Sequence, residues 1–422
     1  MKLLYDVFIF LYPLGVRFLS FFNSKAADWI DGRKGVFESL QSFVDGEERR
    51  IIWMHCSSLG EFEQGLPVLE KLKATYPDYR LVVSFFSPSG YRVRKSHPLP
   101  DYVTYLPMDS KKNAERFLKI LDPALVIFIK YEYWNYYLER LAKTGVPTLM
   151  VSAIFRPDQI FFKPKGYFYR RMLECFSHFF VQDQRSKDLL HSIDMKICCT
   201  VSGDTRFDRV IDIYNNRKAF PIIEQFKGAC EVIVAGSTWK EDDNHLHRLI
   251  KHLPPSVKLI IAPHNITGGD IDRCLKLYPD PVLYSENELA FNNNLPLKEG
   301  RTLIIDNMGM LSSIYYYADV AYIGGGFGRG GIHNTLEAAI YGVPVIFGPV
   351  YDKYKEAIEL IENAGAFSVH DLASLEAMMQ LLLTNKTFLQ KVGDKARDYV
   401  QDRAGASNKV LDFVQAKRLL MI

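Results

Sequence analysis

One stretch decides the fold of this chain: Ile323-Gly324-Gly325-Gly326-Phe327-Gly328-Arg329-Gly330-Gly331-Ile332-His333-Asn334-Thr335-Leu336-Glu337. It ends an apolar, strand-like run and leads into a helix-like run from Thr335 to Tyr341, after which Gly342 precedes another apolar run. Strand, glycine loop, helix and strand form the unit in which free backbone N–H groups at a helix N-terminus bind an anion. Glycines let the backbone approach a phosphate without side-chain obstruction. The stretch therefore predicts a nucleotide-type ligand in this half of the chain.

Short apolar runs alternate with helical patterns along the rest of the sequence, which indicates an α/β protein with parallel sheets. In the first half we expect strands at 51–55, 81–84, 102–105, 125–129, 148–152 and 179–181, and helices at 61–76, 110–120 and 134–144. In the second half we expect strands at 231–235, 258–262, 302–305, 320–323 and 343–346. The pattern predicts two Rossmann-like domains that face each other across a central cleft, with ligands bound at the carboxyl ends of the strands.

A chain of 422 residues is long enough for two cores. The domains are expected at 25–210 and 229–422, joined by a linker at 211–228 that contains Pro221. The last helix is a candidate to pack back on the amino-terminal domain. Residues 1–24 are a separate hydrophobic segment.

The charge-free part of this segment, Val7 to Val16, is shorter than the ~20 residues that a bilayer crossing needs. It is either an anchor lying in the membrane plane or a helix packed on the protein itself. Basic residues follow at Lys25, Arg33 and Lys34, which favours the cytoplasmic side. We favour membrane attachment.

Several function classes are disfavoured. A net charge of +3 does not argue for nucleic acid, and six cysteines without a C-x-x-C pair indicate reduced thiols. The glycine run lacks the G-x-x-x-x-G-K-[ST] pattern of P-loop ATPases and the following acidic residue of nicotinamide dehydrogenases. Asp270-Ile271-Asp272 falls inside a helical pattern, and His245 and His247 face different ways on a helix, so neither predicts a metal site.

Two acidic residues follow strands in the first half. Ser58 and Glu61 form a capping-box pattern, but Glu61 is also a candidate general base, because a helix N-terminus favours an ionised carboxylate. Glu132 lies among aromatic residues in Lys130-Tyr131-Glu132-Tyr133-Trp134-Asn135, which suits carbohydrate binding or simply begins a helix. Arg206 offers a positive charge near the cleft or forms a surface ion pair.

The aromatic and basic stretch from Phe161 to Arg171 has three readings. It could stack on nucleic acid bases, lie against anionic lipid headgroups, or form an ordinary amphipathic helix. The apolar N-terminus favours lipid. In the second half, small or polar residues end four successive strands: Ala235-Gly236-Ser237-Thr238-Trp239, Ala262-Pro263-His264-Asn265, Asp306-Asn307-Met308-Gly309-Met310-Leu311, and the glycine run.

The ordered combination of Ser57–Glu63, Gly203–Asp208, Ala235–Thr238, Asn307–Gly309, and Gly331–Glu337 with Phe347-Gly348-Pro349 resembles the 3-deoxy-D-manno-octulosonic acid (Kdo) transferases of lipopolysaccharide assembly. That resemblance covers nearly the whole chain. It implies a GT-B glycosyltransferase that moves Kdo from CMP-Kdo to a lipid A precursor (lipid IVA), with inversion, at the cytoplasmic side of the inner membrane. CMP-Kdo is the donor substrate, and neither a cofactor nor a bound metal is implied.

By this resemblance Glu61 is the general base, and Glu132 and Arg206 stabilise the transition state. The donor would contact residues of the four strand ends in the second half: Ser237, Thr238, Pro263, His264, Met308, Gly309, Met310, Gly330, Gly331, Asn334, Thr335, Leu336 and Glu337. The chain departs from the family where Pro-Arg is usual at Pro263-His264, and where lysine is usual at Arg206. Arg329 is a candidate substitute for the missing arginine.

Two alternative functions stay open. One is a GT-B transferase or epimerase acting on another nucleotide sugar. The other is a non-enzymatic lipopolysaccharide-binding or nucleic-acid-binding module built around residues 154–171.

Overall fold

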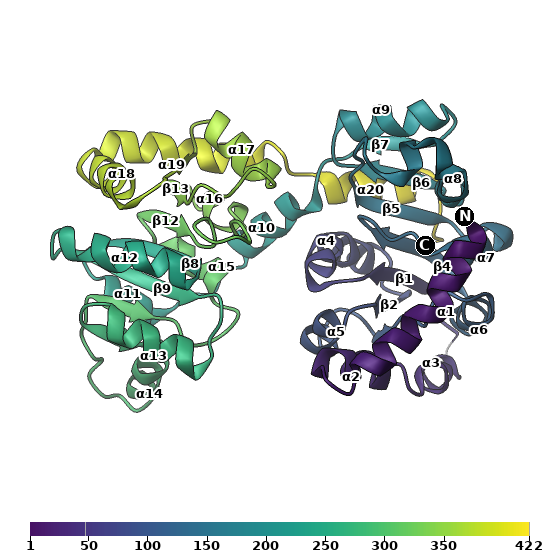
Figure 1. The fold of residues 1–422 in the computed structure, drawn as a ribbon, viewed down its shortest axis with the longest axis horizontal. Helices are drawn as coiled ribbons and strands as arrows, with labels where there is room; N and C mark the ends of the chain where they lie inside the picture. Colours follow the sequence, from purple (N-terminus) through teal and green to yellow (C-terminus); the bar gives the residue numbers. More distant parts are fainter. Residues whose placement is uncertain (47, 422) are drawn as a thin grey trace. The chain divides into compact units, whose positions relative to one another are not determined.

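The computed structural model describes residues 1–46 and 48–421 and divides into two compact units (Figure 1). The first unit comprises Met1–Arg209 and Ala404–Ile422, and the second comprises Val210–Arg403. Each unit is built on its own seven-stranded parallel sheet. The α/β class predicted from the alternating apolar runs is therefore confirmed.

The first sheet has the strand order β3-β2-β1-β4-β5-β6-β7. Its strands are β1 (Ile51–Cys56), β2 (Arg80–Phe85), β3 (Tyr102–Tyr105), β4 (Pro123–Ile129), β5 (Thr148–Ala153), β6 (His178–Val181) and β7 (Cys199–Val201). The connecting helices are α4 (Leu59–Thr75), α5 (Pro88–Arg94), α6 (Lys111–Leu121), α7 (Asn135–Thr144), α8 (Tyr167–Leu173), α9 (Gln184–Ile193) and α10 (Thr205–Asn215).

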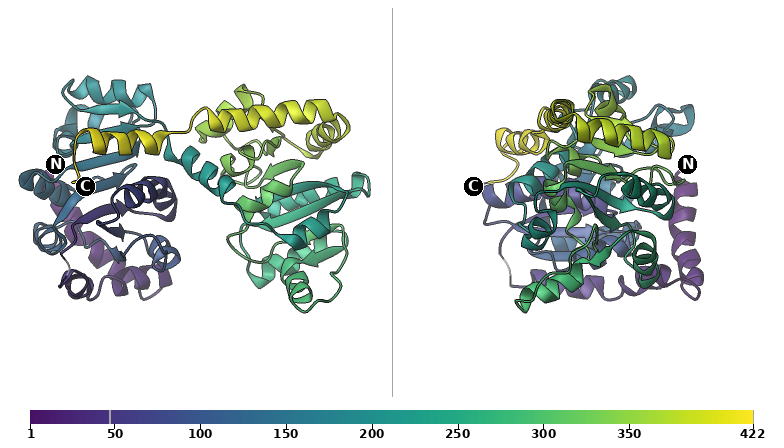
Figure 2. Two further views of the ribbon diagram at one scale, coloured as in Figure 1. Left: turned by 180° about the vertical axis from the view of Figure 1, so that it is seen from behind. Right: turned by 90° about the vertical axis from the view of Figure 1, so that its left-hand side faces the viewer.

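The central strands β1, β4 and β5 are buried along their whole length, as expected for a sheet covered on both faces. On one face, Phe62, Leu66 and Leu69 of α4 pack into a core that also takes in Val410 and Val414. These last two residues belong to α20 (Ala406–Ala416), which therefore returns to the first unit beside α4 (Figure 1; seen from behind in Figure 2). The other face is covered by apolar residues of α3, α6 and α7.

Three helices precede the sheet: α1 (Lys2–Leu19), α2 (Ser24–Asp31) and α3 (Val36–Val44). Helix α1 is fixed to the start of α7, because the Tyr5 hydroxyl hydrogen-bonds to Asp109 and the Tyr136 hydroxyl donates to Asp6 at 2.5 Å. Its Ile9 is buried, whereas Phe10 and Phe18 on the same helix are exposed. Among the described residues, no helix combines the length and hydropathy required to cross a membrane.

The second sheet has the order β10-β11-β9-β8-β12-β13-β14. Its strands are β8 (Glu231–Thr238), β9 (Val257–Pro263), β10 (Pro281–Leu283), β11 (Thr302–Ile304), β12 (Val320–Ile323), β13 (Val345–Phe347) and β14 (Ala366–Ser368). Its helices are α11 (Pro221–Lys227), α12 (Lys240–His252), α13 (Gly268–Leu277), α14 (Tyr284–Asn292), α15 (Leu311–Ile314), α16 (Leu336–Ala339), α17 (Lys355–Glu362), α18 (Leu372–Thr384) and α19 (Lys386–Gln401).

Two sequence predictions are wrong. The linker expected at 211–228 contains the end of α10 and all of α11, because Pro221 begins a helix, where its missing N–H costs nothing, rather than breaking one. The helix expected at 335–341 is only α16, a single turn. Gly342 adopts a left-handed φ of +72° and its carbonyl lies against Gly393, so the chain must turn there.

All eleven predicted strands are present. Three edge or near-edge strands, β7, β10 and β14, were missed. Each has three residues of which at most one is buried, so no apolar run marks it, whereas the equally short β11 and β13 are buried throughout.

Candidate functional site

The candidate catalytic residues lie at the point in the first sheet where the strand order reverses. Strands β1 and β4 are neighbours there, and their successors diverge to opposite sides. Ligands of doubly wound folds bind at such a switch point. Glu61 follows β1 and Glu132 follows β4, so the topology brings the two predicted carboxyl groups to one place.

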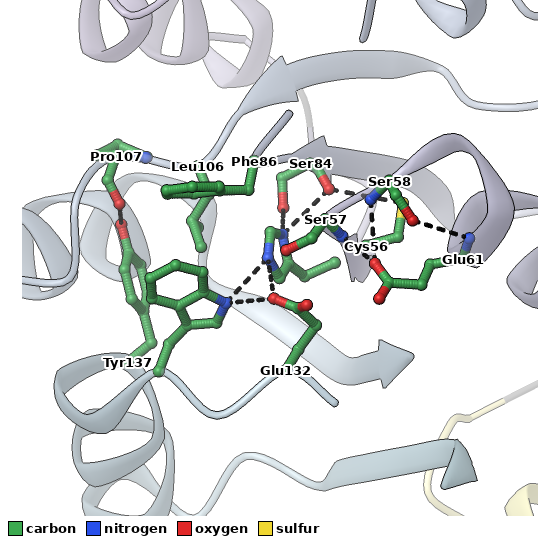
Figure 3. A network of polar contacts seen from close by, with 12 residues as sticks. Cys56, Ser57, Ser58, Glu61, Ser84, Phe86, Leu106, Pro107, Glu132 and Tyr137 are labelled. Carbon is green, nitrogen blue, oxygen red and sulfur yellow. Dashed lines mark hydrogen bonds and ion pairs between the residues drawn. The ribbon is translucent and has the colours of Figure 1, made fainter. Parts of the chain in front are cut away.

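Glu61 lies in the first turn of α4, and the capping box predicted from the sequence is confirmed (Figure 3). Ser58 Oγ accepts the Glu61 N–H at 3.3 Å. In return, Glu61 Oε2 accepts the N–H groups of Ser57 at 2.5 Å and of Ser58 at 3.0 Å. One carboxylate oxygen is thereby held by the backbone, so the side chain has a defined orientation. A capping role does not exclude a role as general base.

Glu132 is 7% exposed and lies just past the end of β4. Its Oε2 atom is 2.6 Å from Trp134 Nε1 and 3.1 Å from His55 Nε2. Figure 3 shows Glu132 with Glu61, Ser57 and Ser84 in one polar network. The predicted aromatic setting of Glu132 therefore includes an indole N–H that binds its carboxylate directly.

The two carboxyl groups affect each other. Burial and the neighbouring charge of Glu132 raise the pKa of Glu61 to about 7. Burial alone would also raise the pKa of Glu132, but the hydrogen bonds from His55, Ser57 and Trp134 outweigh it and lower that pKa. A pair whose environments push the two pKa values apart is typical of acid–base sites. Glu61 is thus poised to accept a proton near neutral pH while Glu132 stays ionised.

Arg206 lies at the start of α10 and is not a free charge. Its Nε donates to Asp204 Oδ2 at 2.8 Å, and Asp204 Oδ1 accepts Gln64 Nε2 at 3.0 Å. Gln64 is on α4, three residues after Glu61. Arg206 is therefore connected to the helix that carries Glu61, and its role in the transition state stays a prediction.

The predicted donor residues lie at the corresponding point of the second sheet, where β8 and β12 are neighbours. The glycines here have a structural role: a Cβ on Gly324 would lie 2.3 Å from Ser237 O, so only glycine lets the two strand ends approach. The hydroxyls of Thr238 and Thr335 are buried and, in the described part of the chain, have no hydrogen-bond partner. Unsatisfied buried hydroxyls are costly, which makes this site a candidate for a polar ligand.

An aromatic stack forms at the same edge. The ring of His264 lies 4.4 Å from Trp239 and 4.5 Å from His333, centroid to centroid, and both pairs are stacked. Trp239 Nε1 donates to His333 Nε2 at 3.0 Å, so this nitrogen carries no proton. Burial and the neighbouring His264 lower the pKa of His333 to about 4. The segment Pro263-His264 therefore contributes a neutral ring to an aromatic stack rather than a positive charge.

The remaining predicted donor residues are spread along this edge. Asn334 donates to Glu337 at 2.9 Å and accepts the Leu336 N–H at 3.1 Å, so these residues stabilise the short α16. Because α16 is one turn, an anion there would be bound by loop N–H groups with little helix dipole. Pro263 ends β9, Met308 is exposed, Gly309 is left-handed, Met310 is buried before α15, and Gly330 and Gly331 lie in the glycine loop.

Sequence reasoning missed His55 and Ser84 in the first unit and Trp239 in the second. The signal for His55 was its place at the end of a strand, directly before the Ser57–Glu61 motif. Ser84 is paired with His55 only through the register of β1 and β2, which the sequence does not show. In the described residues, no group of three or more His, Cys, Asp or Glu side chains is arranged to hold a metal ion. The metal-independent reaction stays a prediction.

The model of the family described as "3-Deoxy-D-manno-octulosonic-acid transferase (kdotransferase)" matches residues 31–209, the part that carries Glu61, Glu132 and Arg206. Full-length relatives extend the match. The 3-deoxy-D-manno-octulosonic acid transferase of Aquifex aeolicus is 27% identical over 86% of this chain and 95% of its own. The chain is therefore similar to Kdo transferases over most of its length. Other Kdo transferases, from Rickettsia bellii and Chlamydia trachomatis serovar A, are 26% and 25% identical and cover 90% and 98% of the chain.

Solved structures of low identity support the fold. The UDP-GlcNAc 2-epimerase of Neisseria meningitidis aligns with a TM-score of 0.61 over 87% of this chain and all of its own, at 14% identity. MurG of Acinetobacter baumannii aligns with a TM-score of 0.54 over 87% and 99% of the two chains, also at 14% identity. The predicted GT-B fold type and the predicted class as a glycosyltransferase are confirmed.

Proposed function

We propose that the protein transfers Kdo from CMP-Kdo to a hydroxyl group of a lipid A precursor. The observation that carries the proposal is the buried pair Glu61 and Glu132 at the switch point between β1 and β4, in the unit that matches the Kdo transferase family. Glu61 would take the proton of the acceptor hydroxyl as the bond to the anomeric carbon forms. Glu132, ionised beside it, would stabilise positive charge that develops on the sugar.

The second unit would bind the donor. Thr238 and Thr335 offer hydroxyls that lack partners within the described residues, and the Trp239–His264–His333 stack offers flat rings. A cytidylate with a single phosphate can be bound by hydroxyl and backbone N–H donors without a metal ion. The proposal therefore needs no cofactor beyond the donor substrate.

A groove beside Glu132 supports a lipid acceptor. It has a volume of about 460 Å³ and is lined mainly by aromatic residues of α1, of the segment after β4 and of residues 159–169. Phe8 and Ile9 of α1 are among the lining residues, and so is Glu132 itself. An apolar chain in this groove would place its polar end beside the carboxylate.

The apolar surface of α1 supports attachment to the cytoplasmic face of the inner membrane. Phe10 and Phe18 of α1, and Phe21 and Phe22 just after it, are each at least two-thirds exposed. A neighbouring pocket of about 330 Å³ is lined by Lys2, Lys165 and Arg171 among others. A fixed helix with exposed aromatic residues next to basic side chains is suited to an anionic lipid surface.

The direct test is incubation of the purified protein with CMP-Kdo and a tetra-acylated lipid A precursor, followed by mass spectrometry of the products. One or more additions of the Kdo mass, with release of CMP, would support the proposal. UDP-hexoses and UDP-N-acetylglucosamine serve as alternative donors. Turnover with one of them but not with CMP-Kdo, or lipid binding without CMP release, would contradict it.

A further inference from the structure

His55 is a fully buried histidine at the end of β1 that the predicted mechanism does not use. Both ring nitrogens are engaged. Nδ1 lies 2.8 Å from Ser84 Oγ and 3.1 Å from the Ser84 carbonyl, and Nε2 lies 3.1 Å from both Glu132 Oε2 and Trp134 Nε1. The side chain therefore joins β2 to the carboxylate at the end of β4.

The direction of these hydrogen bonds follows from the partners that can only donate or only accept. The Trp53 indole Nε1 can only donate, and it lies 2.8 Å from Ser84 Oγ. The single N–H of Trp134 is directed to Glu132 Oε2 at 2.6 Å, which is closer than His55 Nε2 at 3.1 Å. Since Glu132 Oε2 can only accept, its contact with Nε2 assigns the ring proton to Nε2. In the neutral ring Nδ1 then accepts the proton of Ser84 Oγ, whose lone pair takes the Trp53 N–H.

A second donor converges on the same oxygen. Trp134 Nε1 lies 2.6 Å from Glu132 Oε2. Hydrogen bonds to a carboxylate from two ring N–H groups favour its ionised form and fix its orientation. Without them, a buried carboxyl group would tend to be neutral.

We propose that His55 is a positioning residue, set in one tautomer by Trp53 and Ser84, which holds Glu132 as an oriented carboxylate so that Glu61 and Glu132 can be ionised together. This inference rests on the proposed function of the pair as base and charge stabiliser. His55 itself contacts no reacting atom.

The titratable groups around the pair come from three elements. Lys130, at the end of β4, opposes the charge of Glu61, and Tyr133 of the same segment is buried beside Glu132. Burial, and after it the charges of both carboxylates, raise the pKa of the Cys56 thiol of β1. Glu63 of α4 is paired with Arg94 and Arg209, so its charge is balanced. This leaves Glu132 as the like charge that faces Glu61.

The kinetic test compares His55→Met, which removes the donor, with His55→Gln, whose amide N–H can replace it. The pair titrates as a unit. Loss of the donor destabilises the doubly ionised form, so the acidic limb of the kcat/KM profile should move to higher pH in His55→Met. We expect roughly tenfold to hundredfold lower kcat/KM at neutral pH, partial recovery at alkaline pH, and a profile close to that of the wild type in His55→Gln.

Trp134→Phe supplies a second variant in case His55→Met does not fold, because Trp134 is not in the sheet. This variant removes the other hydrogen-bond donor to Glu132 Oε2, and it should move the acidic limb of the kcat/KM profile to higher pH as well. An unchanged limb in both donor-free variants, or equal losses in His55→Met and His55→Gln at every pH, would overturn the proposal. Absence of Kdo transfer by the wild type would instead count against the proposed function.

A readout independent of activity is the side-chain ¹H–¹⁵N spectrum of histidine-labelled protein, with His55 assigned by its absence in His55→Gln. The proposal requires a protonated Nε2 and a bare Nδ1. In Ser84→Ala we expect a mixture of tautomers. A proton on Nδ1 in the wild type at neutral pH would refute the assigned hydrogen-bond direction, whether or not the enzyme is active.

Discussion

Replacement of Glu61 by glutamine should separate catalysis from stability. Glutamine has an amide oxygen that can accept the same two N–H groups, of Ser57 and Ser58, so the capping box is preserved. The amide cannot accept a proton as a base. The Glu61→Gln protein should therefore fold and lose activity.

The stability change can be worked out from the pKa. In the unfolded chain Glu61 ionises near its ordinary 4.5, whereas burial and Glu132 raise its pKa to about 7 in the folded protein. Between these values the native state binds more protons than the unfolded state, so the stability contributed by this group falls as pH rises. Above pH 7 the buried charge of Glu61 lowers the free energy of unfolding by about 3 kcal/mol, and a neutral glutamine avoids this loss. The variant should be more stable than the wild type near pH 8 and equally stable near pH 4.

Activity should change in the opposite direction. General-base catalysis contributes about 10²- to 10⁴-fold, so kcat/KM of Glu61→Gln should fall by at least 100-fold. In the wild type, kcat/KM should fall about tenfold for each pH unit below 7, because only ionised Glu61 accepts the proton.

The assay is urea unfolding at several pH values, followed by tryptophan fluorescence. Trp29, Trp53 and Trp134 lie in the first unit, and a Trp239→Phe background removes the signal of the second. A stability difference between Glu61→Gln and the wild type that does not change with pH would refute the reasoning. So would a variant that retains a tenth of the wild-type rate.

Other predictions concern the lipid surface and the glycine loop. The Phe10→Ser and Phe18→Ser variants should each weaken binding to anionic vesicles by roughly tenfold or more, because each loses a ring that would be buried in lipid. Leu289→Ser, an exposed residue of the second unit, is the matched control in vesicle co-sedimentation; equal effects in all three would argue against α1 as the attachment site. Gly324→Ala should destabilise the second unit by about 1–3 kcal/mol, since its Cβ would meet backbone at 2.3 Å. Gly268→Ala meets nothing within 4 Å and should leave the unfolding midpoint nearly unchanged; a similar loss in both would contradict the packing argument.

The strands and the strand-end motifs could be predicted because each buried strand is a run of apolar residues followed by polar or small ones. Glu61 and Glu132 were identified in this way. That they approach each other depends on β1 and β4 being neighbours, which is a property of topology rather than of either segment. The family resemblance supplied their roles, which stay predictions.

The supporting residues could not be predicted for the same reason. Ser84 belongs with His55 because the register of β1 and β2 pairs these two positions. The shortness of α16 depends on the turn at Gly342, whose carbonyl lies so close to Gly393 that a side chain at Gly393 would not fit. Neither pairing leaves a local pattern in the sequence.

The return of α20 to the first unit has a consequence for synthesis of the protein. Asp208 accepts the backbone N–H groups of Gly405 and Ala406 and the hydroxyl of Ser407, and Val410 and Val414 complete the core beside α4. Once the ribosome has translated residue 403, the second unit is complete, whereas the first unit still lacks one of its helices. The second unit can therefore finish folding first. The first unit, although its synthesis begins earlier, is completed last.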